Sequence, residues 1–312
     1  MRCALCSLPV ALVCVATARL PAAEVTAERS ENGVTVKIDG QLFTEYLVRS
    51  GTKPILWPIL GPGGIPMTRT VPMEKGAGRT SDHPHHRSLW FTHGSVNGVD
   101  FWAESGAKVG SIEHREFVKV QSGPQAVIIA RNDWLGPGRK RICKDERTLT
   151  FGTDGPTRWI DVAIVVTATD GPVTFGDTKE GSFGIRVPDT MRVDAKQGGR
   201  IVNSRGQTDT AAWGKPAEWV DYHGPVDGQT LGIAVLNHPT SFRFPTGWHV
   251  RTYGLFAANP FAQQSFQGKG ESAEGYTLAA GKTLALRWRV LLHRGDEKEG
   301  KVAEAFAAYA KQ

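Results

Sequence analysis

Turn-forming residues divide this sequence into many short segments, and that feature limits the folds open to it. The 36 glycines and 18 prolines are spread along the 312 residues. Between them apolar and polar side chains alternate: Val34 to Ile38 alternates, Asp39-Gly40 is a hairpin turn signal, and Leu42 to Val48 is the expected return strand. The pattern is typical of a many-stranded antiparallel protein.

Further strands are expected along the whole chain, and no helix-period segment of useful length interrupts them before its end. They cover residues 111–120, 126–133, 147–151, 159–169, 183–187, 231–237 and 283–292. Val302, Phe306 and Tyr309 then recur at i, i+4 and i+7, which predicts a short terminal helix. We therefore expect an all-β fold, an antiparallel β-sandwich with a short C-terminal helix, formed by residues 23–312 as a single domain.

Residues 1–22 are expected to be a secretory signal peptide. Arg2 supplies a positive start, residues 3–15 are apolar, and small-residue cleavage sites lie at 16–18 and 20–22. The mature protein would then be secreted or periplasmic, with Cys143 as its one cysteine, most simply a small buried group. After residue 20 no window approaches the roughly 18 apolar residues of a membrane-spanning helix.

The charge of the chain gives no sign of a nucleic-acid partner. Its formal net charge is +6, and the densest basic stretch, residues 139–147, also contains Asp145 and Glu146. Such a mixed stretch is expected to be the solvated face of a strand.

Three of the nine histidines fall within four positions, His83, His85 and His86. In an extended segment, which Pro84 favours, His83 and His85 point to one side and His86 to the other. Two imidazoles on one side could form half of a site for zinc, copper, nickel or iron. The alternative is one buried, hydrogen-bonded histidine in a polar loop. Nearby Trp90 could stack on a sugar ring or belong to the core.

A second group of polar residues lies downstream. His249, Arg251 and Tyr253 alternate, so a strand would direct all three to one face, where they would suit a polyhydroxylated or anionic ligand. The alternative is a polar strand face bonded to neighbouring loops. Glu180 precedes an expected strand, and it could be a metal ligand, a general base or the partner of Arg186.

These motifs resemble those of a secreted bacterial family labelled "methane oxygenase PmoA". The matching segments are SDHPHHRSLWF, KEGSFGIRV, LNHP, GWHVRTYGLFAANPF and LLHRGD. The methane oxygenase subunit of that name spans the membrane several times, so methane oxidation is not implied. The resemblance implies a galactose-mutarotase-like β-supersandwich, in which sugars bind across a concave sheet lined by His, Arg and acidic groups. Ser88 stands where Gly is expected, and Asn237 where Asp is commoner, which weakens a role for His238.

Together these observations predict an exported carbohydrate-active enzyme, with hydrolase, lyase or epimerase chemistry on a sugar or glycoside. The expected catalytic residues are His85, His86, Glu180, His249 and Tyr253. The expected substrate-binding residues are Arg87, Trp90, Arg186, Trp248 and Arg251. The expected ligands of a divalent metal are His83, His85 and His238.

Two alternatives remain open at this stage. The same residues could form a glycan-binding module without catalysis. A copper redox protein is less favoured, since only Met67, Met73 and Met191 remain as thioether ligands and none is adjacent to the histidines in sequence.

Overall fold

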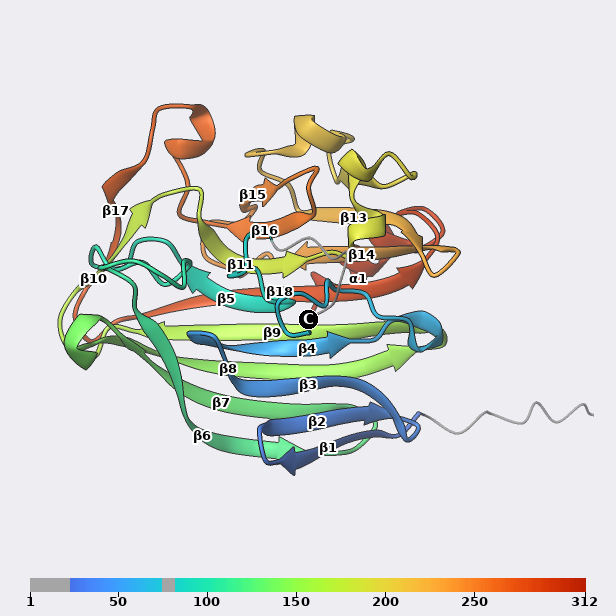
Figure 1. Cartoon of the computed structure of the whole chain (residues 1–312), viewed down its shortest axis with the longest axis horizontal. Coiled ribbons are helices and arrows are strands. Elements are labelled where there is room, and N and C mark those ends of the chain that lie inside the picture. The colour runs from blue at the N-terminus through green and yellow to red at the C-terminus, as the bar shows by residue number, and fades with distance from the viewer. Residues whose placement is uncertain (1–22, 75–81) are drawn as a thin grey trace, which may run out of the picture.

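The computed structural model describes residues 23–74 and 82–312, so the predicted signal peptide lies outside the described residues. Two eight-stranded antiparallel sheets form the molecule (Figure 1). The first sheet contains, in spatial order, β1 (Val25–Ser30), β2 (Gly33–Ile38), β3 (Gln41–Ser50), β4 (Lys53–Ile59), β5 (Leu89–His93), β11 (Gly181–Arg186), β16 (Leu255–Asn259) and β15 (Gly247–Val250).

The second sheet contains β12 (Arg200–Asn203), β13 (Trp219–Val226), β14 (Gln229–Asn237), β18 (Thr283–Arg294), β9 (Thr157–Thr167), β8 (Arg141–Asp154), β7 (Ala126–Leu135) and β6 (Ser111–Gln121). A separate ribbon pairs β10 (Val173–Asp177) with β17 (Ser272–Leu278) at one end of the molecule (Figure 1). Within the described residues, the α-helix is α1 (Val302–Tyr309), and the 3-10 turns are Pro62–Gly64, Pro137–Arg139, Asp189–Met191, Val193–Ala195, Asp209–Ala212 and Ser265–Gln267.

The predicted antiparallel β-sandwich with a C-terminal helix is confirmed. The β2–β3 hairpin turns at Asp39-Gly40, where both residues have positive φ, and α1 covers the predicted residues. No helix in the described part of the chain is long and apolar enough to cross a membrane.

The main core lies between the two sheets. Phe91 and Phe183 of the first sheet enter this core with Trp288 of the second, and Phe183 stacks on Trp288 with ring centroids 4.8 Å apart. Because side chains alternate along a strand, Trp90 and Gly184 face the opposite side of the first sheet. That outer face carries a smaller apolar cluster, called here the outer cluster: Ile55, Trp90, Trp102, Leu255 and Ala257.

The basic stretch 139–147 differs from the expected solvated face. Arg141 and Lys144 are exposed, but Asp145 and Arg147 are buried beside Cys143. They alternate along β8, so every second residue of this strand enters the core.

Candidate functional site

The outer cluster provides an aromatic floor on the first sheet. The Trp90 and Trp102 rings lie 5.2 Å apart, and the His86 ring stacks on Trp90 at 5.4 Å with 16° between their planes. Gly184 makes this possible, because a Cβ at that position would lie 2.6 Å from the Trp90 indole. Glycine therefore lets the indole lie directly against β11.

The histidine segment, residues 82–86, turns instead of extending. His83 has a φ of 48°, and the His86 amide donates to the His83 carbonyl at 2.9 Å. The expected division of the rings between two sides is therefore wrong: His83 stacks on His86 at 4.9 Å, and His85 lies edge-on to His86 at 4.4 Å. Tyr253 stacks on the other side of the segment, with its ring 5.0 Å from His83.

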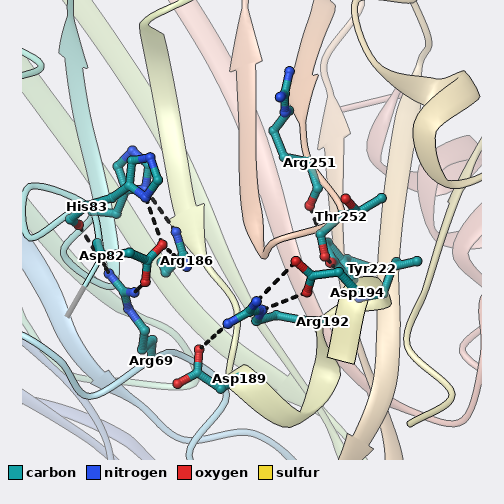
Figure 2. Close-up of polar contacts among 12 residues, drawn as sticks. Arg69, Asp82, His83, Arg186, Asp189, Arg192, Asp194, Tyr222, Arg251 and Thr252 are labelled. Atoms are coloured by element: carbon teal, nitrogen blue, oxygen red, sulfur yellow. Dashed lines mark hydrogen bonds and ion pairs between the residues drawn. The ribbon is translucent and has the colours of Figure 1, made fainter. Parts of the chain in front are cut away.

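Asp82 joins the histidine segment to two buried arginines (Figure 2). It accepts from Arg69 Nη1 at 2.7 Å and from Arg186 Nη2 at 2.9 Å, and its Oδ2 lies 2.7 Å from His83 Nδ1. Partial burial opposes ionisation, but the His83 hydrogen bond and the arginine charges hold the pKa of Asp82 well below its usual range. Asp82, not Glu180, is thus the partner of Arg186.

Arg186 also fixes the tautomer of His86. The Arg186 guanidinium donates from Nη1 to His86 Nδ1 at 3.2 Å, so in the uncharged ring the proton resides on Nε2. This Nε2 is buried and has no hydrogen-bond partner among the described residues. His86 therefore presents a free N–H donor beside the aromatic floor.

A second ion network lies beside His85. Glu104 accepts from Lys53 at 2.7 Å and binds Arg87 through both carboxylate oxygens, each at 2.7 Å. Burial lowers the pKa of the fully buried Lys53 to about 8, although Glu104 opposes that shift. The guanidinium of Arg87, a predicted substrate-binding group, is thus held by Glu104.

Three imidazoles of the site are uncharged at neutral pH. Burial and the Lys53 charge lower the pKa of His85 to about 4, and burial and the Arg251 charge lower that of His249 to about 3. Burial, with nearby positive charge, likewise sets the pKa of His86 well below its usual value. The pKa of the Glu180 carboxyl group is raised, because burial outweighs the opposing charge of Lys179.

His249, Arg251 and Tyr253 share one neighbourhood although β15 ends at Val250. The Trp213 ring lies 6.4 Å from the His249 ring, and the Arg251 guanidinium lies 5.8 Å from Trp213 and 5.6 Å from Tyr253. His249 Nδ1 is buried without a hydrogen-bond partner in the described chain. Tyr253 connects this group to the histidine segment, so the two parts of the site meet.

Two predicted residues lie elsewhere. Trp248 enters the core between the sheets, where its indole donates to the Ala217 carbonyl at 3.0 Å, because alternation along β15 places it opposite His249. His238 follows β14 of the second sheet. Its ring lies 5.0 Å from Tyr309 of α1, and its Nδ1 is 2.8 Å from Thr240 Oγ1.

The residues present do not fit the metal centre expected from His83, His85 and His238. His238 packs against α1, away from the histidine segment. His83 and His85 remain neighbours, with ring centroids 5.8 Å apart, but the third predicted ligand does not join them. Among residues 23–74 and 82–312, the ligand atoms close enough for one ion are instead those of Asp221, His223 and Glu297, all within 4.8 Å of one another.

The three methionines considered as thioether ligands lie in two places. Met67 and Met191 lie in the main core, while Met73 packs against the outer cluster.

Several site residues escape sequence reasoning. Lys53 begins an apolar strand, and Arg69 and Glu104 lie in loops without a motif, so only long-range contacts reveal them. Trp213 follows a 3-10 turn far from the histidines in sequence. Ser88, where the resemblance led us to expect Gly, has a φ of 52°, a backbone region that favours glycine, and lies 2.8 Å from the Thr68 hydroxyl.

Comparison with known proteins gives one sequence family and several distant structures. The model of a family of unknown function, DUF6807, matches residues 33–307, and no curated protein matches. The methane oxygenase label is not part of this description.

Similar structures include the alpha-galactosidase from Lactobacillus brevis (9% identity, TM-score 0.44, covering 92% of this chain and 42% of that one). They also include a Glycoside Hydrolase Family 97 enzyme from Pseudoalteromonas sp. strain K8 (8% identity, TM-score 0.35, covering 87% of this chain and 34% of that one). A galactose mutarotase-like protein from Clostridium acetobutylicum is matched over most of both chains (10% identity, TM-score 0.39, covering 87% of this chain and 98% of that one). This chain thus spans about two fifths and one third of the first two proteins.

Proposed function

We propose that this chain, which belongs to the DUF6807 family of unknown function, is an exported enzyme that acts on a sugar or glycoside by proton transfer. The observation that carries the proposal is the set of buried donors without partners on the outer face of the first sheet. In the described residues these include His86 Nε2, Arg186 Nε and the indole nitrogens of Trp57, Trp90 and Trp102.

A sugar carries many of the acceptor oxygens that these donors lack. Each buried polar atom without a partner costs about 1–3 kcal/mol, so a ligand rich in acceptor oxygens gains by pairing with several at once. The half-buried Trp213, whose ring lies 6.4 Å from that of His249, offers an aromatic surface for the apolar C–H face of a sugar ring. A hydroxylated ring therefore matches both the polar and the apolar parts of the site.

The opposite pKa shifts of His249 and Glu180 support proton transfer. His249 is unprotonated and has a free Nδ1, whereas Glu180 holds its proton to a higher pH than an ordinary carboxyl group. Groups whose surroundings separate their pKa values in this way are suited to serve as base and acid. We assign His249 as the base and Glu180 as the acid, with His85 as a second uncharged imidazole beside the floor.

A non-catalytic glycan-binding protein is the second candidate. Asp82 and Glu104 are each engaged by two cations, which leaves Glu180 as the acidic group of the site least committed to ion pairs. Aromatic stacking with few free acids favours binding without turnover.

The test is product formation from a panel of glycosides by the purified protein. Wild type is compared with His249→Ala, Glu180→Gln and the control His114→Gln, whose imidazole lies on β6 of the second sheet. We expect both site variants to lose about 10²–10⁴-fold in rate with unchanged circular dichroism, and the control to stay active. Glycan binding without any product would favour the binding protein, and fully active site variants would exclude this base and acid.

A further inference from the structure

The Arg251 guanidinium is a cation without a carboxylate. No hydrogen bond or ion pair joins it to another side chain in the described ranges, and its contacts are the faces of Trp213 and Tyr253. Figure 2 shows the contrast: Arg69, Arg186 and Arg192 are tied to aspartates, whereas the Arg251 side chain points away from the Arg192–Asp194 pair.

The backbone holds this cation in place. The Tyr222 hydroxyl donates to the carbonyls of Arg251 at 3.3 Å and Thr252 at 3.0 Å (Figure 2). The Arg251 amide donates to the Leu255 carbonyl at 2.8 Å. These bonds fix the backbone from which the side chain starts, and the Trp213 and Tyr253 rings confine its guanidinium, so the cation is preorganised for a ligand.

A pocket opens beside Arg251. Its volume is about 240 Å³, and it is lined by Thr210, Trp213, Val250, Arg251 and Thr252. The size is below the roughly 300–1,000 Å³ of pockets for drug-sized ligands, so it suits one sugar unit. The buried Trp213 Nε1 lacks a hydrogen-bond partner among the described residues, as does Nδ1 of the neighbouring, almost fully buried His249.

The charges around the site leave positive charge uncompensated. Arg69 and Arg186 share Asp82, Lys53 and Arg87 share Glu104, and Arg251 has no carboxylate. Lys179 is balanced by Glu271, whose carboxylate lies 2.8 Å from it. With the imidazoles uncharged, a neutral ligand would leave Arg251 unpaired.

We infer that the proposed enzyme takes an acidic sugar, and that Arg251 binds the single negative charge of one sugar unit stacked on Trp213. This inference rests on the proposed function and names its substrate class. The planar guanidinium fork matches the two oxygens of a carboxylate or of a sulfate ester. A ligand anion would also offset the positive charge that lowers the pKa of His249, which makes its nitrogen a stronger base when substrate is bound.

Calorimetric binding of small glycosides to the full chain tests this inference. The probes are the methyl glycosides of glucuronate and galacturonate with their methyl esters, and methyl glucoside 6-sulfate with neutral methyl glucoside. We expect an acid to bind about 10–100-fold more tightly than its ester. Arg251→Gln should abolish that preference and Arg251→Lys should restore part of it. The control Arg139→Gln removes an equal charge from an exposed arginine paired with Glu113, and it should leave the preference unchanged.

Each outcome decides the inference. Equal binding of acid and ester, no binding of either charged probe, or a preference that survives Arg251→Gln would overturn it. Whether the uronates or the sulfate ester carry the preference identifies the anion. Turnover of neutral glycosides without an acid preference would keep the proposed function and reject the acidic substrate. Binding of the acids that depends on Arg251, without any product, would keep the acidic ligand and reject the proposed enzymatic function.

Discussion

At the scale of single residues, Arg186 sets the chemistry of its neighbours. This fully buried guanidinium holds Asp82 ionised and keeps the proton of His86 on Nε2. Its charge also contributes, after burial and nearer charges, to the low pKa values of His85 and His86. This cation therefore fixes the tautomer of His86 and adds to the burial that keeps His85 and His86 unprotonated.

The pH dependence of kcat/KM should follow the free enzyme's base and acid. The pKa of His249 is lowered to about 3, so activity should fall below about pH 3 as the imidazole becomes protonated. The pKa of Glu180 is raised, so activity should fall again as pH rises through that value. A pH–rate profile tests both limbs, and Glu180→Gln should remove the alkaline limb. An activity maximum above pH 8 would contradict the assignment.

Gly184→Ala should disturb the aromatic floor, because the new Cβ would lie 2.6 Å from the Trp90 indole. We expect a loss of about 1–3 kcal/mol in unfolding free energy, measured with denaturant, and weaker sugar binding. Unchanged stability and affinity in Gly184→Ala would show that Trp90 does not need this contact.

At the scale of secondary-structure elements, β13 and β18 share a buried hydrogen-bonded group in the second sheet. Asp221 Oδ2 lies 2.7 Å from His293 Nε2, and Asp221 Oδ1 lies 2.7 Å from His223 Nδ1. Burial would lower the pKa of His293, but Asp221 raises it overall, and Asp221 itself is lowered despite burial by both histidines. The group links the two strands to the segment that leads into α1.

This group should make stability depend on pH in a defined window. Because His293 has a raised pKa, its contribution is complete below about pH 6.5 and is lost as pH rises through the folded value. Because Asp221 has a lowered pKa, its contribution is complete above about pH 4 and is lost as pH falls. Denaturant unfolding across pH should show the decline above pH 6.5 weakened in His293→Gln. An unchanged curve would contradict this account.

At the scale of the whole molecule, a buried polar network crosses from one sheet to the other. Asp145 of β8 accepts from Trp134 Nε1 at 2.7 Å and from Arg147 Nη2 at 2.9 Å. Arg147 also reaches the Phe91 carbonyl of β5 in the first sheet at 3.4 Å. The two sheets are therefore joined by a hydrogen bond from the charged Arg147 guanidinium as well as by apolar packing.

Removal of one member of this network should cost more than removal of both. Arg147→Met leaves Asp145 as an uncompensated buried charge, so we expect a loss of about 3–5 kcal/mol in unfolding free energy. Adding Asp145→Asn should recover part of that loss, since no buried charge then remains. Additive effects in the double-mutant cycle would mean that the two residues are energetically independent.

The sequence predicted local features better than long-range ones. Alternation identified the β2–β3 hairpin and many of the longer strands, and the 3.6-residue period identified α1, because these patterns are short in range. The turn at His83 was missed, since the ion pairs of Asp82 with Arg69 and Arg186 that accompany it are not visible in a local pattern. His238 was grouped with His83 and His85 as a metal ligand, but it follows β14 of the second sheet, whereas those two lie over the outer face of the first sheet.

The strands β5 and β11 are buried on both faces along their whole length. Only the backbone of the first sheet thus separates Phe91 and Phe183 in the interior from Trp90 and Arg186 in the site. A methylene gained or lost on the interior side would shift the binding side through this shared backbone. Variation in the sandwich interior of related chains could therefore retune ligand preference without altering any group that touches the ligand.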